Sequence, residues 1–415
     1  MRIPAGLLGV FFSIVLMAGC GLPPPLTPAA PQGPTSGRPG ETYEFTALTW
    51  DPLGLPIQYC FSWGDGQSSD WTCFMPGGMP VSATHAWETA GEYSVRVQAR
   101  NIARRVSEWS PAHDMTVRGQ GGYPDSVVAR IPVGCAPFGM CILPNNEYVY
   151  VANRIGGVSV ISTATKTVVR TIATPAEPAF VAATPSGQYV YLAMANNTVG
   201  VIRTSDNVIV KSVAVGSSPH ELVCSPDGNR VYVTNYYDHT VSVIRTSDNT
   251  VVANVPIPGY PWCVEATPDG EFVYASGRGT DSVAVIRTSD NQVEAYVEAG
   301  REPGDLEFTP DGRYCYVSCR LDNNVAVIRA SDLEVVARIP GCSHPTGIAI
   351  LADGSYAYLS NYHDDYVLIA RTADNTVAET LQFGATTDFS AVDRNRSEAY
   401  IGVPNKDEVW VVGWR

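Results

Sequence analysis

Along most of the chain, apolar and polar residues alternate over short stretches, as in TYEFTAL, EYSVRVQA and RVYVTN. Alternation with a period of two is typical of β-strands that have one buried face. Clusters of Gly, Pro, Asn, Asp and Ser separate these stretches and supply the residues that tight turns require. The pattern therefore predicts an all-β protein that consists of many short strands.

In the C-terminal part of the chain the strand pattern recurs at a fixed interval. The phrase VVARIP and its equivalents begin 41 or 42 residues apart, at Val127, Val168, Ile209, Val251, Val293, Val335 and Val377. Each unit contains four predicted strands, which in the third unit read IVKSVAVG, ELVCS, RVYVTN and TVSVIRT. A helical solenoid is the alternative, but it would need a 3.6-residue apolar spacing that these units lack. Seven four-stranded units predict a seven-bladed β-propeller over residues 126–415.

The two ends of the repeat region complement each other. SVVARIP, at residues 126–132, has the pattern of the outermost strand of a blade, whereas the last unit stops after its third strand, VWVVGWR. Pairing of these two segments would complete the seventh blade and leave no open sheet edge in the ring. We therefore expect the propeller to be closed by this pairing, which is known as Velcro closure.

The first residues have the pattern of an export signal. Arg2 precedes the apolar run LLGVFFSIVL, which is too short to span a bilayer, and Met17-Ala18-Gly19-Cys20 follows it. We interpret residues 1–19 as a signal peptide. Ala18-Gly19-Cys20 resembles the lipobox of bacterial lipoproteins, which implies that Cys20 is lipidated and anchors the chain to a membrane. Cleavage elsewhere, as in an ordinary secreted protein, is the alternative.

Residues 20–40 are rich in Pro and small residues, and we expect them to form a stiff, lipid-anchored tether. Residues 41–118 then carry the strands TYEFTAL, IQYCFSW and EYSVRVQA. With them, WGDG at residues 63–66, His85-Ala86-Trp87 and GEYSV at residues 91–95 resemble the PKD family of immunoglobulin-like domains. The resemblance implies a β-sandwich that serves as a spacer or adhesion module. Residues 119–125 are the predicted linker to the propeller.

Tyr232-Val233-Thr234-Asn235 and its equivalents in other units resemble the YVTN family of propeller repeats, over residues 126–415. Three units share the identical phrase VIRTSDN, and five units have an Arg with an Asp three positions later, as in Arg203 and Asp206. We interpret these pairs as local bracing of a turn, worth about 0–1 kcal/mol each because water screens exposed ion pairs. A ring of arginines that binds an anionic partner is the alternative.

Charge narrows the classes of function. The 415-residue chain has a net charge of −14, which provides no basic surface for a phosphate backbone, so we expect no nucleic-acid partner. Its length is sufficient for more than one domain. No nucleophile elbow or metal-binding motif is present in the sequence, and we predict no cofactor and no metal centre. Asp51 and Asp65 are weak candidates for Ca²⁺ ligands, and turn capping is the interpretation that we favour for them.

The innermost strands of a propeller line its central channel, so residues that enter these strands are candidates for a site. At this place the units differ: the third has His220 and Glu221, the fourth Trp262, the fifth Asp305 and the seventh Asp388. Imidazole, carboxylate and aromatic groups are suited to a pocket for a small molecule or a peptide. We therefore take these five as candidate ligand-binding residues. No catalytic residue is assigned, because neighbours on a strand, such as the first two, point to opposite sides.

Two cysteine pairs are candidates for disulfides in an exported protein. Cys60 and Cys73 flank the WGDG turn, and a bond between them would contribute about 3 kcal/mol by the loop-closure estimate. Cys319 and Cys342 lie in loops or strand ends that we expect on one face of the propeller. Free, buried thiols are the alternative for both pairs.

The order of these parts favours a binding function. The lipid anchor would attach the chain to a membrane. The tether and the spacer domain would then present the mouth of the propeller to a protein, a glycan or a small ligand in the cell envelope. This describes a membrane-anchored binding, adhesion or scaffold protein exposed at the surface or in the periplasm. The alternative is an exported enzyme such as a lactonase or lyase, since seven-bladed lactonases share the fold. Such an enzyme would use His220, Glu221, Asp305 or Asp388.

Overall fold

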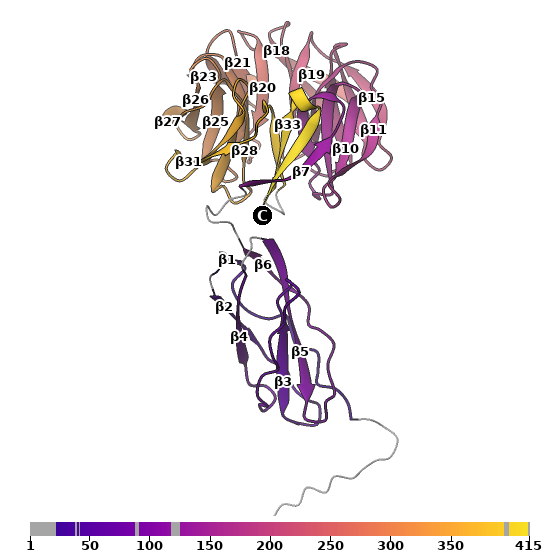
Figure 1. Ribbon diagram of the computed structural model, residues 1–415. Coiled ribbons are helices and arrows are strands. Elements are labelled where there is room, and N and C mark those ends of the chain that lie inside the picture. The colour runs from indigo at the N-terminus through magenta and orange to yellow at the C-terminus, as the bar shows by residue number, and fades with distance from the viewer. Residues whose placement is uncertain are drawn as a thin grey trace, which may run out of the picture. The chain divides into compact units, whose positions relative to one another are not determined.

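The computed structural model describes residues 22–37, 40, 42–87, 91–117, 125–393 and 398–413. The chain divides into two compact units, residues 1–118 and 119–415 (Figure 1). As predicted, the described residues form strands almost throughout, with a single short 3₁₀ helix, η1, at Pro404–Lys406. None of them forms a helix with the length and hydrophobicity that crossing a bilayer requires. The predicted signal peptide and the lipidation residue Cys20 lie outside the described residues.

The N-terminal unit is a two-sheet β-sandwich, as its sequence motifs imply. One sheet has the order β1-β6-β5-β3 and the other pairs β2 with β4. The strand bounds are β1 Ser36–Gly37, β2 Thr42–Ala47, β3 Ile57–Ser62, β4 Val81–Ala86, β5 Gly91–Asn101 and β6 His113–Val117. Alternate residues of these strands are buried between the sheets, for example Phe45 on β2 and Tyr59 on β3.

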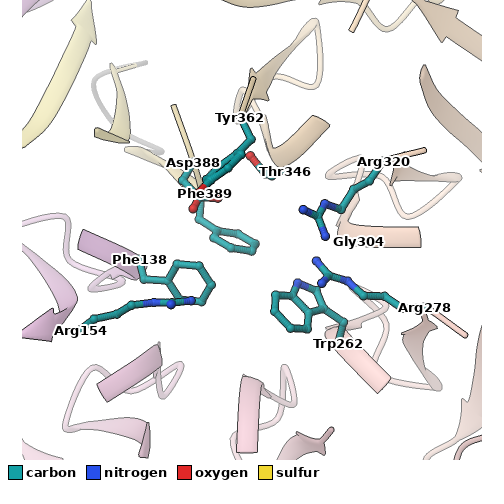
Figure 2. A pocket seen from close by; sticks show the side chains of 10 residues that line it. All are labelled: Phe138, Arg154, Trp262, Arg278, Gly304, Arg320, Thr346, Tyr362, Asp388 and Phe389. Carbon is teal, nitrogen blue, oxygen red and sulfur yellow. The ribbon is translucent and has the colours of Figure 1, made fainter. Parts of the chain in front are cut away.

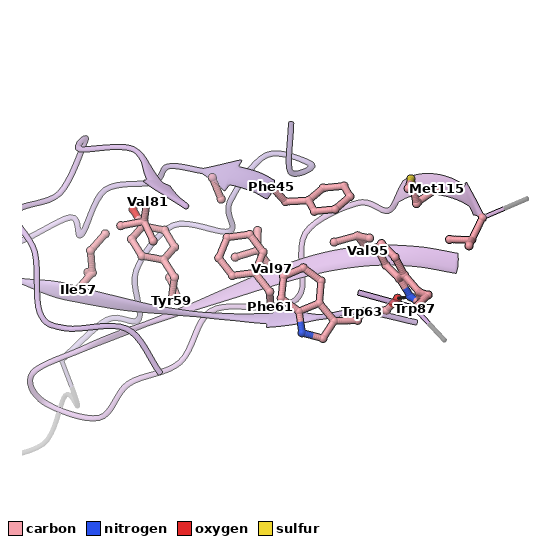
Figure 3. Packing of buried hydrophobic residues seen from close by; sticks show 13 residues of the cluster. Phe45, Ile57, Tyr59, Phe61, Trp63, Val81, Trp87, Val95, Val97 and Met115 are labelled. Atoms are coloured by element: carbon pink, nitrogen blue, oxygen red, sulfur yellow. Dashed lines mark hydrogen bonds between the residues drawn. The ribbon is translucent and has the colours of Figure 1, made fainter. Parts of the chain in front are cut away.

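The motif residues of this sandwich meet in its core (Figure 3). Trp63 stacks on His85 with ring centroids 4.8 Å apart, and Trp87 donates its indole N–H to the carbonyl of Trp63 at 3.2 Å. His85 Nε2 lies 2.8 Å from a carboxylate oxygen of Asp65, in the WGDG turn. The turn itself is possible because Gly64 adopts a φ of 84°, where a side chain would meet the backbone of the neighbouring strand. The WGDG and His-Ala-Trp motifs are therefore parts of one packing unit.

The Pro-rich segment that we expected to be a free tether packs on the sandwich from residue 25 onward. Pro25, Pro28 and Pro31 are buried, which gives a spacing of three residues and matches the three residues per turn of polyproline II. Leu26 donates its backbone N–H to Trp50 at 2.9 Å, and β1 pairs in parallel with β6. Prolines lack a backbone donor but can still bury one face of an extended strand. The described part of this segment thus belongs to the domain.

The C-terminal unit contains seven four-stranded antiparallel sheets, as the repeat predicts (Figure 1). We number these blades along the chain, with the innermost strand given first. Blade 1 is β8 Cys135–Ile142, β9 Tyr148–Ile155, β10 Gly157–Ser162 and β11 Thr167–Ile172. Blade 2 is β12 Pro178–Ala183, β13 Tyr189–Met194, β14 Thr198–Arg203 and β15 Val208–Ala214. Blade 3 is β16 Pro219–Cys224, β17 Arg230–Asn235, β18 Thr240–Arg245 and β19 Thr250–Pro256.

The remaining blades repeat this arrangement. Blade 4 is β20 Pro261–Ala266, β21 Phe272–Gly277, β22 Ser282–Arg287 and β23 Gln292–Glu298. Blade 5 is β24 Pro303–Phe308, β25 Tyr314–Cys319, β26 Asn324–Arg329 and β27 Glu334–Pro340. Blade 6 is β28 Pro345–Ile350, β29 Tyr356–Asn361, β30 Tyr366–Arg371 and β31 Thr376–Gln382. Blade 7 is β32 Ser390–Asp393, β33 Glu398–Val403, β34 Glu408–Gly413 and, from the start of the propeller, β7 Ser126–Pro132.

Pairing of β34 with β7 confirms the predicted Velcro closure. The register runs from Glu408 opposite Pro132 to Gly413 opposite Ser126. It includes a bulge between Val411 and Val412, at the place where the outer pairs of the other blades also shift register. The outermost strand pair of the closing blade therefore has the same geometry as the outermost pairs of these other blades.

A buried tyrosine on the second strand of several blades ties that blade to the next one. Tyr191 of blade 2 donates its hydroxyl hydrogen to Asn249 Oδ1 of blade 3 at 2.6 Å, and Tyr316 makes the same bond to Asn375. Asn249 is the last residue of a VIRTSDN phrase and has a φ of 56°, which Asn tolerates better than most residues. The repeated phrase thus provides a turn and, in its first two copies, an interblade hydrogen bond to Asn207 or Asn249.

The Arg–Asp pairs of the repeat brace this turn, as predicted, in four of five units. Nitrogen–oxygen distances are 2.5–2.8 Å in the pairs Arg203–Asp206, Arg245–Asp248, Arg287–Asp290 and Arg329–Asp332. In the fifth unit, Arg371 donates instead to Thr376 Oγ1 at 3.0 Å. In four units the Asp thus neutralises the Arg, which favours local bracing over the anion-binding ring that was the alternative.

Replacing Tyr191 by Phe is expected to destabilise the propeller by about 1 kcal/mol, since Asn249 Oδ1 loses its donor. Tyr232→Phe is the matched control, because the hydroxyl of Tyr232 has no hydrogen-bond partner among the described residues. Equilibrium urea unfolding of both variants measures the difference. Equal losses of stability in the two variants would contradict this role for the tyrosine.

Candidate ligand site at the propeller mouth

The inner strands begin with a local irregularity that shapes the mouth of the channel. In blade 3 the register shifts between Pro219 and Leu222, so His220 and Glu221 fall outside the regular ladder. The same shift occurs after the first residue of the inner strands of blades 2, 4, 5 and 6. Bulges of this kind redirect side chains, and they are common beside binding sites. The two residue positions that we singled out from the repeat are the bulged positions.

A cavity of about 150 Å³ lies at this mouth (Figure 2). Six of its ten lining residues occupy the two bulged positions: Phe138, Trp262, Gly304, Thr346, Asp388 and Phe389. Two of the five predicted ligand-binding residues, Trp262 and Asp388, thus line the cavity directly. His220 contacts two lining residues, whereas Glu221 and Asp305 belong to a neighbouring cluster described below.

The other four lining residues are Arg154, Arg278, Arg320 and Tyr362, which the sequence analysis missed. Each follows the fourth residue of its YVTN-like tetrapeptide, at the end of the second strand of its blade. The sequence does contain a signal for these residues, namely that their position varies between units. In chain order it reads Arg, Ala, Tyr, Arg, Arg, Tyr and Pro. Antiparallel pairing places the end of the second strand beside the start of the inner strand, so both variable positions share one mouth.

Two guanidinium groups point into the cavity from adjacent blades. In Figure 2, Arg278 and Arg320 extend toward each other and toward its centre. Burial, together with the charge of Arg320, lowers the pKa of Arg278 to about 10, so it remains a cation at neutral pH. The Nε atoms of both residues are buried and have no hydrogen-bond partner among the described residues. Glu302 lies 3.5 Å from Arg320 and only partly offsets this positive charge.

Aromatic rings form the wall of the mouth. Phe138, Phe180 and Phe389 pack edge to face, with centroids 4.5–5.4 Å apart. Trp262 packs against this group, and the guanidinium of Arg278 lies 3.3 Å from the centroid of its ring. Arg154 lies in the same way over Phe138, at 4.3 Å. These cation–π contacts hold the guanidinium groups in place and leave their N–H donors available.

His220 is held behind this wall with one ring nitrogen unused. Its ring packs against Trp262 with centroids 3.4 Å apart and a tilt of 32°, and Nδ1 lies 3.0 Å from the carbonyl oxygen of Trp262. A carbonyl only accepts, so Nδ1 carries the hydrogen and Nε2 of the neutral ring is an acceptor. Burial, followed by the charge of Arg278, lowers the pKa of His220 well below its usual value. Nε2 is buried without a partner among the described residues.

Glu221 and Asp305 meet in a second cluster, together with Cys263. These residues occupy the second bulged position of blades 3, 5 and 4 respectively, and one ligand atom from each lies within 4.8 Å of the others. Burial and the proximity of Asp305 raise the pKa of Glu221 well above its usual value, and burial also raises the pKa of Asp305. Asp305 accepts backbone hydrogen bonds from Ile348 at 2.7 Å and Leu306 at 3.0 Å.

Asp388 is the carboxyl group of the cavity itself. It is 4% exposed, and burial raises its pKa to about 6 although Arg154 and Arg320 favour the charged form. One carboxylate oxygen, Oδ1, is buried without a partner among the described residues. The cavity therefore combines cations, aromatic walls and an acid that titrates near neutral pH.

Neither predicted disulfide forms in the structure, where all four cysteines are free thiols. Cys60 Sγ faces the carbonyl of Ser69 at 3.2 Å, whereas Cys73 is exposed. Cys319 packs in the hydrophobic cluster between blades 4 and 5, and Cys342 packs in the cluster between blades 5 and 6. A blade therefore separates the two thiols of the second pair.

The two candidate Ca²⁺ ligands of the sandwich already have protein partners. Asp51 accepts hydrogen bonds from the backbone of Leu53 and Leu55 and from the side chain of Asn101. Asp65 accepts from the backbone of Gln67 and pairs with His85. These are the contacts of turn-capping residues, which is the interpretation that we favoured.

The fold and the site together define a class: a seven-bladed β-propeller with an arginine-rich pocket at one end of its channel. Residues 150–389, more than half of the chain, match the family model "Lactonase, 7-bladed beta-propeller". The chain belongs to this family of seven-bladed β-propeller lactonases. Residues 26–112 match the model of the PKD domain, which includes the Pro-rich segment that packs on the sandwich.

Comparison with curated proteins finds no match. Among solved structures, a chain of hydrazine synthase from Kuenenia stuttgartiensis has 21% identity and a TM-score of 0.62, covering 67% of this chain and 95% of its own. The β-propeller domain of Cps50 (Swd1) from Myceliophteria thermophila has 14% identity and a TM-score of 0.62, covering 70% and 99%. Because 1159 solved chains match, similarity at this level shows the fold and carries no information on the ligand.

Proposed function

We propose that the mouth of this propeller binds a small organic anion, with a carboxylate or phosphate group held by Arg278 and Arg320. The observation that carries this proposal is the pair of half-buried guanidinium groups that face one cavity, each with a buried and unused Nε donor. Burying a cation is unfavourable unless a partner compensates it. An anion with two acceptor oxygens is the partner whose geometry fits a guanidinium best.

The composition of the cavity supports this choice. The protein as a whole has a net charge of −14, so three arginines at one mouth form a local exception to its general character. Phe138, Trp262 and Phe389 would contact an apolar or planar part of the ligand. The aromatic walls favour an organic acid over a free inorganic ion, since only the former has an apolar part to bury.

We also propose that the chain performs this binding role in the cell envelope. The export signal, the lipobox-like Ala18-Gly19-Cys20 and the PKD domain before the propeller support this location. A lipidated Cys20 would attach the domains to a membrane and leave the mouth available to a soluble ligand.

Lactone hydrolysis is the second candidate, and two observations favour it: the family to which the chain belongs and the acceptor Nε2 of His220. In such a reaction water adds to the lactone carbonyl and the ring ester bond opens to give a hydroxy acid. His220 would accept a proton from that water, and the arginines would hold the carboxylate of the product. Binding and hydrolysis thus use the same pocket and differ in whether the ligand is recovered unchanged.

Isothermal titration with benzoate, using benzamide as a neutral ligand of the same shape, tests the anion site. We expect benzoate to bind and benzamide to bind at least ten times more weakly. Arg278→Ala and Arg320→Ala are each expected to weaken benzoate binding by about 10- to 100-fold, the loss of one charge-assisted hydrogen bond. Arg203→Ala, which removes an exposed arginine on the outer edge of blade 2, is the control and should bind normally.

Equal affinity for benzoate and benzamide would contradict the proposal. A panel of lactones incubated with the protein then separates the two candidates. Recovery of intact lactones supports a binding function, whereas base-consuming ring opening that is lost in His220→Gln supports hydrolysis.

The affinity for benzoate should fall as the pH rises through about 6. Below this pH the buried Asp388 is protonated and neutral, and above it the carboxylate repels an anion in the same cavity. Asp388→Asn should abolish this step and keep the affinity of the low-pH form at all pH values between about 5 and 8. Titrations at several pH values measure the effect. An identical pH profile in the variant would show that another group is responsible.

The proposed anchor predicts that Cys20→Ser releases the protein from the membrane fraction of cells. Without the acyl chains the hydrophobic attachment is lost, because each buried methylene contributes about 0.8 kcal/mol. Fractionation followed by immunodetection measures the distribution. A variant that stays with membranes as the wild type does would argue against lipidation at this residue.

A further inference from the structure

Below the cavity, three potential metal ligands converge from three consecutive blades. Glu221 of β16, Cys263 of β20 and Asp305 of β24 occupy the same position of their inner strands, two residues after the initial Pro. A carboxylate oxygen, a thiol sulfur and a second carboxylate oxygen lie within 4.8 Å of one another. Ring symmetry brings them together, since equivalent positions of neighbouring blades face the same part of the channel.

The cluster has an unused and buried ligand atom. Oε2 of Glu221 is buried and has no hydrogen-bond partner among the described residues, although it lies in a group with a second carboxyl. Two carboxylates at this separation repel each other unless a proton or a cation lies between them. The Glu221 carboxyl group has a hydrogen bond with the Cys263 thiol, and a proton or a cation is what remains to be supplied at Oε2.

Asp305 is oriented as a metal-binding carboxylate usually is. The backbone amides of Leu306 and Ile348 each donate to one of its oxygens, at 3.0 and 2.7 Å. Hydrogen bonds of this kind fix the direction of a ligating carboxylate and leave further lone pairs free for a metal ion. The residue is 6% exposed, so its position does not depend on the surface.

We propose that Glu221, Cys263 and Asp305 form a Zn²⁺ site in the channel of the propeller. A thiolate between two carboxylates favours zinc over Ca²⁺ or Mg²⁺, which take oxygen ligands alone. Three protein ligands leave a fourth position of a tetrahedral ion open, as in zinc sites that carry a water or a substrate atom. The site shares no residue with the lining of the anion pocket, so metal binding and anion binding can be tested separately.

The surrounding charges are compatible with a dication. Glu265 and Glu307, two residues farther along the same inner strands, add negative charge near the cluster. Burial, Glu221 and Asp305 raise the pKa of the Cys263 thiol well above its usual value, and the guanidinium of Arg278 opposes this only in part. A thiolate at this place therefore needs the charge of the metal ion itself. Once ionised, the three ligands would carry a charge of −3, which a dication reduces to −1.

Co²⁺ titration of the metal-free, full-length protein tests the site, because a thiolate bound to Co²⁺ gives a charge-transfer absorption in the near ultraviolet. The exposed Cys73 and Cys135 are first replaced by Ser, which removes accessible thiols unrelated to the cluster. We expect one equivalent of Co²⁺ to bind with this absorption, and Zn²⁺ to displace it. Cys263→Ser should abolish the absorption, and Glu221→Gln and Asp305→Asn should each weaken binding at least tenfold.

Cys224→Ser serves as the matched control, since Cys224 also lies on an inner strand but outside the cluster. It should leave the absorption and the stoichiometry unchanged. Circular dichroism establishes that each variant is folded, and Glu221→Gln, which preserves side-chain size, keeps the test valid if Cys263→Ser is unstable. Absence of stoichiometric Co²⁺ binding would overturn the proposal. Persistence of the absorption in Cys263→Ser would overturn it as well.

Discussion

The pairing of β34 with β7 is the constraint on which the rest of the propeller depends. It joins the two ends of the repeat region into one sheet and thereby fixes the ring at seven blades. Buried hydrophobic clusters between neighbouring blades, and hydrogen bonds such as Tyr191 to Asn249, then hold each blade in its place. Because the ring is closed, the inner strands must converge on a narrow channel, and residues far apart in the sequence meet there.

Convergence of the inner strands explains the composition of the site. Its residues vary from blade to blade, whereas the strands that hold them are repeated in every blade. The repeated strands determine where a bulge lies and where the second strand ends, and the side chains at these places vary between the seven units. Arg278 and Arg320 come from adjacent blades, with the ring of Trp262 beside the first and the carboxylate of Glu302 beside the second. Glu221, Cys263 and Asp305 form a cluster of acidic groups close to them. If both proposed sites are occupied, one channel would bind an anion at the arginines and a cation at this cluster.

Much of the fold and part of the site could be predicted from the sequence. The period of 42 residues, the four-strand pattern and the complementary ends predicted all seven blades and their closure, because each depends on local alternation and simple counting. Trp262 and Asp388 were found because their units differ at a position that the repeat identifies. The arginines were missed because the second strand was treated as uniform beyond its YVTN-like tetrapeptide, and the Pro-rich segment was separated from the domain that it covers.

The sequence by itself determined the strands, the number of blades and the turns, since backbone preferences and hydrophobic alternation act over a few residues. Only the tertiary structure decided which side chains share a site and what charge they carry. His220 and Glu221 are neighbours in the chain, yet one packs against Trp262 and the other meets Asp305. The pKa values of Asp388 and Arg278 depend on burial and on charges from other blades, which no local pattern specifies. The chemistry of this protein is therefore a property of the closed ring.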